Sequence, residues 1–97
     1  MAPVKFSLII PTYNEAANIA ELCRQLIAVL KDVPFEFEII IVDDDSPDGT
    51  GGIARGLAKE DRRIKLLSRI NKKGLATAVI YGWDHAEGEI LGVIDAD

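Results

Sequence analysis

The sequence predicts an α/β fold in which a parallel sheet of about four strands carries helices on both faces. Two observations support this prediction. Short apolar runs typical of buried strands lie at residues 6–10, 37–42, 64–67 and 89–94. Between these runs the apolar residues recur at helical spacing, so strand and helix alternate along the chain. Such alternation implies right-handed crossovers between parallel strands, and therefore a Rossmann-like sheet.

The first expected strand, residues 6–10, is rich in β-branched residues and is followed by a proline. We expect Pro11 to end this strand, because proline has no N–H to donate to a strand ladder. From Glu15 to Leu30 the apolar residues follow a helical period. Asn14 is the expected N-cap of this helix, and Glu15 would lie in its first turn.

The second expected strand, residues 37–42, is apolar enough to be covered on both faces, as parallel strands usually are. A turn at residues 46–49 leads into a helix over residues 53–58, which neighbouring glycines weaken. A third strand, a loop, and a helix with its apolar face over residues 75–86 then precede the fourth strand. Each helix would therefore connect two parallel strands.

Length, composition and charge set the broad class of the protein. A length of 97 residues allows one domain at most, and we take residues 1–97 as that single domain. A hydrophobic content of 48% with 28% charged residues is typical of a folded protein rather than a disordered one. The net charge of −5 argues against non-specific binding of nucleic acid.

The cysteine content and the hydropathy indicate where the protein works. The single cysteine, Cys23, falls within a helical apolar stripe and cannot form an internal disulfide. This usage indicates a reducing compartment. Because the first residues lead into a strand rather than a signal peptide or an apolar membrane span, we expect a cytoplasmic location.

An acidic triplet, Asp95-Ala96-Asp97, directly follows the fourth apolar run. Strand alternation would point Asp95 and Asp97 to the same side, with Ala96 leaving room for a bulky group. Two carboxylates so close repel each other unless a cation lies between them or one is protonated. One interpretation is an oxygen-rich site for Mg²⁺ or Mn²⁺ that also holds a diphosphate, and the other is a solvated turn.

Other polar residues are expected at the same edge of the sheet, because the carboxyl ends of parallel strands lie together and bind ligands in such folds. Tyr13 offers a flat face for a base, although packing against the first helix is an equal alternative. Glu15 offers an acceptor for base or ribose donors, and Asp44 an acceptor for a ring N–H of uracil or guanine. The segments that would meet there are residues 11–15, 43–46 and 95–97.

Several neighbouring residues have simpler interpretations. For Asp43 we favour a role in holding a loop over a contact with a ligand. Ser46 and Asp48 are expected to organise the turn and the start of the next helix. No glycine-rich phosphate loop follows a strand, which argues against an ordinary ATPase or a dinucleotide-binding protein.

The motifs at residues 11–15, 42–50, 74–78 and 95–97 together resemble those of family 2 glycosyltransferases. Their order and spacing are most similar to the dolichol- or polyprenyl-phosphate mannosyltransferase group. The resemblance implies the nucleotide-binding half of a GT-A fold and a nucleotide-sugar donor, GDP-mannose or alternatively a UDP-sugar. It also implies Mg²⁺ or Mn²⁺, a lipid-phosphate acceptor at the cytoplasmic face of a membrane, and sugar transfer with inversion.

The same resemblance assigns five residues to the nucleoside pocket: Pro11, Tyr13, Glu15, Val42 and Asp44. It assigns Asp95, Ala96 and Asp97 to the ribose, diphosphate and metal, with Asp95 and Asp97 as metal-binding residues. Two positions depart from the family pattern. Asp45 stands where Gly or Asn is frequent, and Ala76 where Gly is frequent, which bears on donor specificity rather than on the fold.

The resemblance places the acceptor-binding half of such enzymes beyond Asp97. We therefore expect residues 1–97 alone to turn over little or no substrate, and we expect an uncovered fourth strand to promote self-association. The alternatives are a non-catalytic nucleotide- or metal-binding module and a receiver-like signalling domain. The receiver alternative is disfavoured because such domains need an acidic pair after the first strand, where this chain has Pro11-Thr12-Tyr13.

Overall fold

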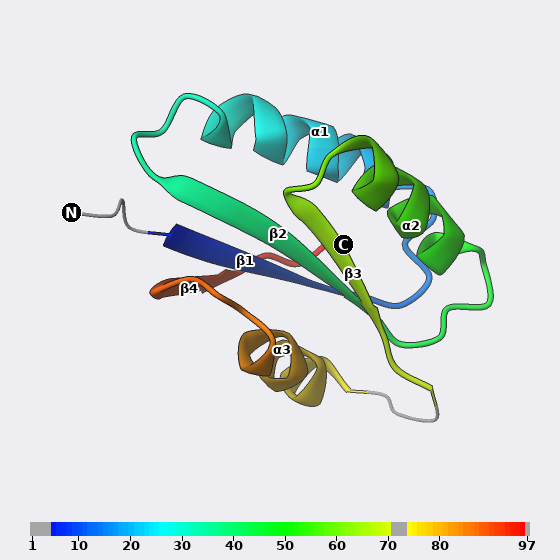
Figure 1. Ribbon diagram of the computed structural model, residues 1–97. Helices are drawn as coiled ribbons and strands as arrows, with labels where there is room; N and C mark the ends of the chain where they lie inside the picture. Colours follow the sequence, from blue (N-terminus) through cyan, green and yellow to red (C-terminus); the bar gives the residue numbers. More distant parts are fainter. Residues whose placement is uncertain (1–4, 71–73, 97) are drawn as a thin grey trace.

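The computed structural model describes residues 5–70 and 74–96. Its four strands form one parallel sheet in the order β3–β2–β1–β4. Three helices alternate with the strands, which confirms the predicted α/β architecture (Figure 1). The elements in chain order are β1 Lys5–Thr12, α1 Ile19–Leu30, β2 Glu36–Asp43, α2 Thr50–Glu60, β3 Ile64–Ser68, α3 Leu75–Asp84 and β4 Ile90–Val93.

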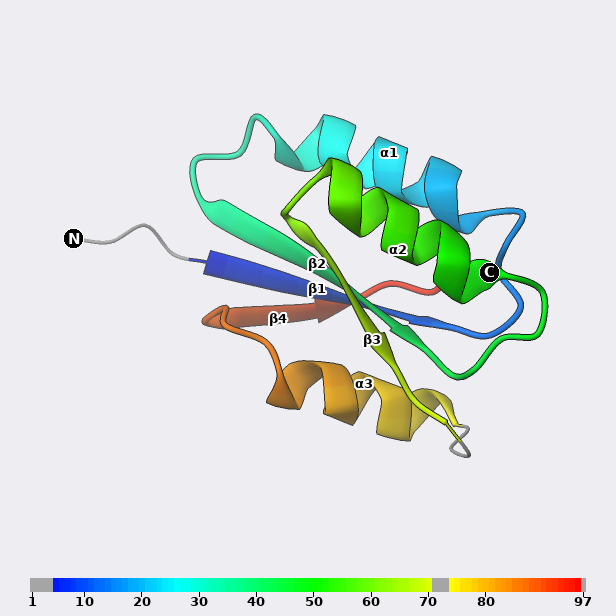
Figure 2. The same ribbon diagram turned by 45° about the vertical axis from the view of Figure 1, so that its right-hand side comes forward.

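The helices cover both faces of the sheet, as predicted. α1 and α2 lie together on one face and α3 lies on the other (Figure 2). A larger apolar cluster under α1 and α2 includes Ile10, Ile39 and Ile41. A smaller cluster beneath α3 contains Ile9 and Ile40. Successive residues of β1 and β2 therefore enter opposite clusters, which is why these two strands are apolar on both faces.

The end of β1 differs from the prediction, because the strand continues through Pro11 to Thr12. The backbone carbonyls of Lys5 and Ile9 accept hydrogen bonds from residues next to β4. The backbone N–H and C=O groups of the odd-numbered residues of β1 therefore point toward β4. The pairing of β1 with β4 ends at Ile9 and Val93. Pro11 thus lacks its N–H on a side where the ladder has already finished, and the strand tolerates it.

The start of α1 also differs, and the prediction of Asn14 as its N-cap is wrong. α1 begins at Ile19 with Asn18 as the N-cap residue. Asn14 has a φ of 58°, in the left-handed region. The carbonyl of Glu15 accepts hydrogen bonds from the Asn18 and Ile19 N–H groups at 3.0 and 2.9 Å, so Glu15 lies in a turn that precedes the helix. Residues 13–18 are consequently a loop at the carboxyl edge of the sheet.

A buried carboxylate organises the opposite, amino-terminal end of the strands. Glu38 in β2 is 2% exposed. It accepts hydrogen bonds from Ser7 Oγ at 2.5 Å, Lys65 Nζ at 2.6 Å and the Glu87 N–H at 2.7 Å. Ser7 Oγ in turn accepts a hydrogen bond from the Gly88 N–H at 2.8 Å. The loop that enters β4 is therefore held against β1 and β2.

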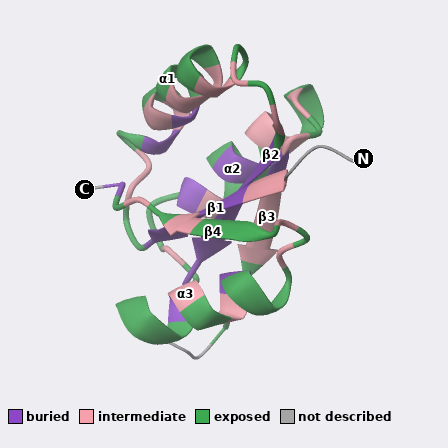
Figure 3. Ribbon diagram, turned by 90° about the vertical axis from the view of Figure 1, so that its left-hand side faces the viewer, coloured by how far each residue is buried: buried purple, intermediate pink, exposed green. Residues whose placement is uncertain are grey.

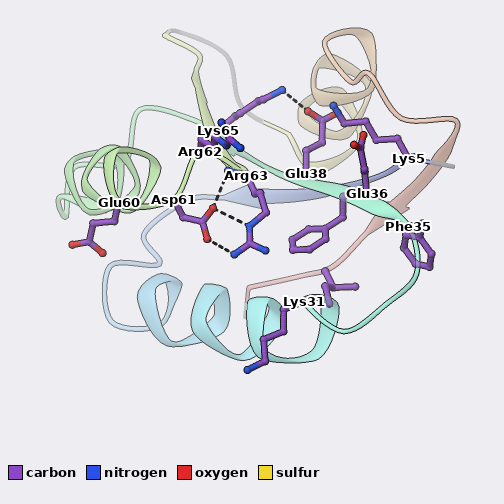
Figure 4. Close-up of a pocket in the computed structure, with 12 residues that line it drawn as sticks. Lys5, Lys31, Phe35, Glu36, Glu38, Glu60, Asp61, Arg62, Arg63 and Lys65 are labelled. Atoms are coloured by element: carbon purple, nitrogen blue, oxygen red, sulfur yellow. Dashed lines mark hydrogen bonds and ion pairs between the residues drawn. The ribbon is translucent and has the colours of Figure 1, made fainter. Parts of the chain in front are cut away.

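A hollow of about 790 Å³ lies at this same end of the sheet (Figure 4). Arg63 donates two hydrogen bonds to Asp61, at 3.0 Å from Nε and 2.8 Å from Nη2. Its guanidinium carbon lies 5.0 Å from the ring centre of Phe37. Because Lys65 also pairs with Glu38 here, these charges satisfy one another, which favours a structural role for the hollow.

Candidate functional site

A second pocket, of about 290 Å³, opens at the carboxyl ends of β1, β2 and β4. Five of the eight residues predicted for the site line it. Strand topology alone brings them together, since they come from three segments far apart in the sequence. The lining residues are Pro11, Thr12, Tyr13, Glu15, Asp44, Gly74, Leu75, Ala78 and Asp95.

The other three predicted residues do not line this pocket among the residues described. Val42 is fully buried and packs with Ile9 and Ala78 in the cluster beneath α3. Ala96 is 7% exposed and belongs to the cluster under α1 and α2. Asp97 lies outside the described residues. Because β4 ends at Val93, the expected strand alternation does not extend to Asp95 and Ala96.

Asp44 is held by a buried ion pair with Arg69, the residue that follows β3. Arg69 Nε donates to Asp44 Oδ1 at 2.7 Å, and Nη2 donates to Oδ2 at 2.8 Å. The side chains are 4% and 7% exposed, respectively. These hydrogen bonds are the main reason that the pKa of Arg69 is raised. Asp44 therefore faces the pocket with one fixed orientation of its carboxylate.

Asp43, next to Asp44, holds the loop after β2, which confirms the favoured interpretation. Its carboxylate accepts hydrogen bonds from Thr12 Oγ1 at 2.8 Å, from Ser46 Oγ at 2.6 Å and from the Ser46 N–H at 3.1 Å. Ser46 Oγ also accepts a hydrogen bond from the Asn14 N–H at 2.9 Å. One carboxylate thus connects β1, β2 and the two loops that follow them.

Asp48 and Thr50 fix the loop that carries Tyr13 and Glu15. Asp48 Oδ1 accepts from the Thr50 N–H at 3.0 Å and from Thr50 Oγ1 at 2.5 Å. Asp48 Oδ2 accepts from the Ala16 N–H at 3.0 Å, and Thr50 Oγ1 accepts from the Glu15 N–H at 2.9 Å. The hydrogen bond from Thr50 is the largest cause of a lowered pKa at Asp48. The expectation that Asp48 organises the turn and the helix start is confirmed.

The two departures from the family pattern fall at different kinds of position. Asp45 has a φ of 54°, in the left-handed region where glycine and asparagine are favoured. The departure at Asp45 therefore concerns backbone conformation as well as charge. Ala76 is exposed in the first turn of α3, outside the pocket.

The pocket offers carboxylate oxygen, which suits a hard cation, and the second predicted ligand, Asp97, lies outside the described residues. Asp95 lines the pocket, and carboxylate oxygen is the donor that Mg²⁺ and Mn²⁺ prefer. Within residues 5–70 and 74–96, no three side chains of His, Cys, Asp or Glu gather closely enough to hold a metal ion. The described part of the chain therefore supplies Asp95 as one candidate ligand.

An apolar groove of about 440 Å³ adjoins the pocket and shares Pro11, Leu75 and Asp95 with it. Its walls come mainly from α3 and β4. Much of both elements is exposed (Figure 3). Trp83 is 39% exposed and Ile80 is 53% exposed. None of the helices in the described ranges has the length and apolar character needed to cross a bilayer.

The sequence predicted no role for the exit of β3, yet Arg69 at this exit pairs with Asp44. The signal was available, because Ser68-Arg69 follows the third apolar run and reaches the same edge of the sheet as the other exits. Leu75 and Ala78 were also missed as lining residues. Their helix packs over the sheet, and a helical period does not reveal which turn reaches a pocket.

Comparison with known proteins identifies the family. The model of the family "Glycosyl transferase family 2" matches residues 7–97. The chain is 43% identical to the dolichol-phosphate mannosyltransferase of Pyrococcus furiosus over 94 residues, which are 97% of this chain and 26% of that protein.

Solved structures agree with this assignment. The mannosyltransferase PcManGT of Pyrobaculum calidifontis, in complex with GDP-Man and Mn²⁺, matches with a TM-score of 0.77 at 30% identity, over 100% of this chain and 28% of that one. TarS of S. aureus, in complex with UDP-GlcNAc, matches with a TM-score of 0.72 at 32% identity, over 97% of this chain and 27% of that one. The chain thus spans about a quarter of each of these proteins, and it belongs to glycosyl transferase family 2.

Proposed function

We propose that the protein is a metal-dependent glycosyltransferase that transfers mannose from GDP-mannose to a dolichol or polyprenyl phosphate with inversion. Residues 1–97 would form its nucleotide-sugar-binding domain. The observation that carries the proposal is the convergence of Tyr13, Glu15, Asp44 and Asp95 on one pocket at the carboxyl ends of the strands. The relative from Pyrococcus and the Pyrobaculum complex support mannose and GDP over other donors.

The pocket residues have separate tasks in this proposal. Tyr13, 41% exposed, offers its ring to a base, and Glu15 offers acceptors to base or ribose hydroxyl groups. Asp44 accepts the ring N–H groups of the base. Each of its oxygens already accepts one hydrogen bond from Arg69. A carboxylate has about four lone-pair sites, so capacity for a base remains.

We assign the metal to Asp95 and Asp97, whose carboxylates suit either Mg²⁺ or Mn²⁺. When bound, the cation would neutralise negative charge on the donor's diphosphate. In the reaction an acceptor phosphate oxygen forms a bond to the anomeric carbon while the bond from that carbon to the diphosphate breaks. The residues of this chain would bind and orient the donor. A UDP-sugar is the alternative donor, by analogy with the TarS complex.

We further propose that the complete enzyme acts at the cytoplasmic face of a membrane, where a lipid-phosphate acceptor resides, and that residues 1–97 alone turn over little or no substrate. The exposed apolar side chains of β4, which include Leu91 and Val93, would favour self-association of this chain. Sedimentation across a concentration series tests this point. A single monomeric species at the highest concentration would refute self-association.

Calorimetric titration tests the proposed donor site. The ligands are GDP-mannose, GDP and UDP, each with and without Mn²⁺. We expect binding of GDP-mannose that requires metal and is lost in Asp97→Ala. Asp32→Ala, which removes an exposed carboxylate between α1 and β2, is the matched control and should bind as the unmodified chain does. Indifference to all three ligands, or equal loss in both variants, would refute the proposed site.

A further inference from the structure

We propose that Arg69 is a positioning residue that joins the two walls of the nucleotide pocket, an inference that rests on the proposed function. One wall consists of the strand exits and includes Asp44. The other is the start of α3, with Gly74, Leu75 and Ala78. Arg69 does not line the pocket. Its guanidinium lies behind the lining and hydrogen bonds to both walls.

The contacts of Arg69 define this role. Its Nε and Nη2 donate to the two oxygens of Asp44, at 2.7 and 2.8 Å. Nη2 also donates to the carbonyl oxygen of Gly74 at 3.3 Å. That carbonyl accepts the first hydrogen bond of α3, from the Ala78 N–H at 3.0 Å, and a bond from Thr77 Oγ1 at 3.1 Å. A single buried guanidinium therefore connects the carboxylate proposed to read the base with the first turn of the facing helix.

Contacts with β2 and with α3 hold the backbone and the guanidinium of Arg69 in place. The Arg69 N–H donates to the carbonyl of Asp43 at 2.9 Å, which extends the pairing of β2 and β3 by one residue. The guanidinium carbon lies 5.9 Å from the ring centre of Tyr81, one helical turn beyond Ala78, within the range of a cation–π contact. Few alternative positions are therefore open to the Arg69 side chain.

Only a planar fork satisfies these partners together. Arginine presents several N–H donors in fixed directions, whereas lysine presents one compact ammonium on a flexible stem. A lysine at position 69 would keep the positive charge near Asp44. It would lose the paired hydrogen bonds to the Asp44 carboxylate and the hydrogen bond to the Gly74 carbonyl. The orientation of Asp44 and the position of the α3 start would then be less restricted. Donor binding would have to order both, which weakens the affinity.

Two substitutions test this inference, Arg69→Lys and the matched control Arg63→Lys. Arg63 makes the same two-pronged contact with Asp61 at the opposite end of the sheet. We expect Arg69→Lys to weaken binding of GDP-mannose with Mn²⁺ about tenfold, as for the loss of one charge-assisted hydrogen bond. We also expect faster hydrogen exchange of the Ala78 amide. Thermal unfolding scans of both variants serve as the control for folding. Arg63→Lys should change neither quantity.

The outcomes separate the two proposals. Unchanged affinity in Arg69→Lys, or unchanged exchange at Ala78, overturns the role of Arg69, because charge alone would then suffice. If the unmodified chain binds no nucleotide, the donor site is refuted, and the exchange at Ala78 alone decides whether Arg69 joins the two walls. If Arg69→Lys does not fold, Tyr81→Leu replaces it. This variant should weaken binding of GDP-mannose and speed hydrogen exchange of the Ala78 amide, each about threefold. If neither quantity changes, the proposed role of Arg69 is overturned.

Discussion

The hydrogen-bond network of Glu38 leads to a prediction about stability and its dependence on pH. The change is Glu38→Gln, which keeps the shape of the side chain and removes its charge. Glu38 is 2% exposed, and its Oε2 accepts from Ser7 Oγ and from the Glu87 N–H, while Oε1 accepts from Lys65 Nζ. In the variant the amide oxygen keeps the first two bonds without the charge. The amide nitrogen meets Lys65, which is also a donor.

The expected loss follows from these contacts. Two hydrogen bonds to the buried carboxylate lose their charged acceptor, at about 1 kcal/mol each. The Lys65 side chain is 42% exposed and turns to water, so the lost ion pair adds less than about 1 kcal/mol. We therefore expect the free energy of unfolding to fall by about 2–3 kcal/mol at neutral pH. Glu36→Gln, on the same strand but exposed, should change it by less than about 0.5 kcal/mol.

The loss should also depend on pH. Burial alone would raise the pKa of Glu38, but the hydrogen bonds from Lys65, Ser7 and the Glu87 N–H outweigh it, so the pKa is lowered. A group whose pKa is lower in the folded state adds stability above its unfolded pKa, and this stability disappears as the pH falls through the folded pKa. The difference between the unmodified chain and Glu38→Gln should therefore shrink under acidic conditions.

Urea denaturation followed by circular dichroism measures both effects. Curves at neutral pH give the loss itself, and curves at roughly pH 3, below the usual pKa of glutamate, give its acid dependence. A loss at neutral pH as small as that of Glu36→Gln would show that the network contributes little. A loss of equal size at both pH values would show that the ionised carboxylate is not its source. Either result would refute the reasoning.

Further predictions concern four single residues away from the pocket lining. Gly88→Ala should lower the unfolding free energy by about 1–3 kcal/mol, because a Cβ there would lie 2.7 Å from the Ser7 backbone N and 2.9 Å from the Lys5 carbonyl oxygen. Gly52→Ala, in helix α2 with nothing within 4 Å of the new Cβ, should instead raise it by about 0.5–1 kcal/mol, and urea denaturation that ranked the two variants equally would contradict this. Asp45→Gly should raise the unfolding free energy by about 0.5–1 kcal/mol in the same assay, since a φ of 54° strains a residue with a Cβ; a loss instead would mean that Asp45 makes a stabilising contact. Burial raises the pKa of the Cys23 thiol to about 11, so a thiol reagent near pH 8 should react slowly with the folded chain and quickly in urea. Equal reaction rates in the two conditions would show that Cys23 is accessible.

Much of the fold was predictable from the sequence, because secondary structure follows local periodicity. The alternation of apolar strands and amphipathic helices led to the parallel sheet with helices on both faces, which the structure confirms. The boundaries at Pro11 and Asn14 were missed for a different reason. Whether a proline ends a strand depends on whether a neighbouring strand still needs its N–H. Here β4 has already stopped pairing at Ile9.

The candidate site was also predictable in part. Topology places the carboxyl ends of parallel strands along one edge, so Tyr13, Asp44 and Asp95 could be expected together. The contribution of Arg69 could not be weighed from the sequence. A basic residue after a strand has many possible partners, and only the packing of β3 beside β2 brings it to the Asp44 carboxylate.

The sequence by itself determined the order of strands and helices along the chain, the edge of the sheet where polar residues gather, and the family to which the motifs are similar. The tertiary structure decided which partners each of two neighbouring carboxylates takes. Asp43 and Asp44 are adjacent and chemically identical, yet one holds a loop and the other faces the pocket against Arg69. Their partners come from segments distant in the chain. Partner choice depends on distances that periodicity and spacing do not contain, and only packing sets those distances.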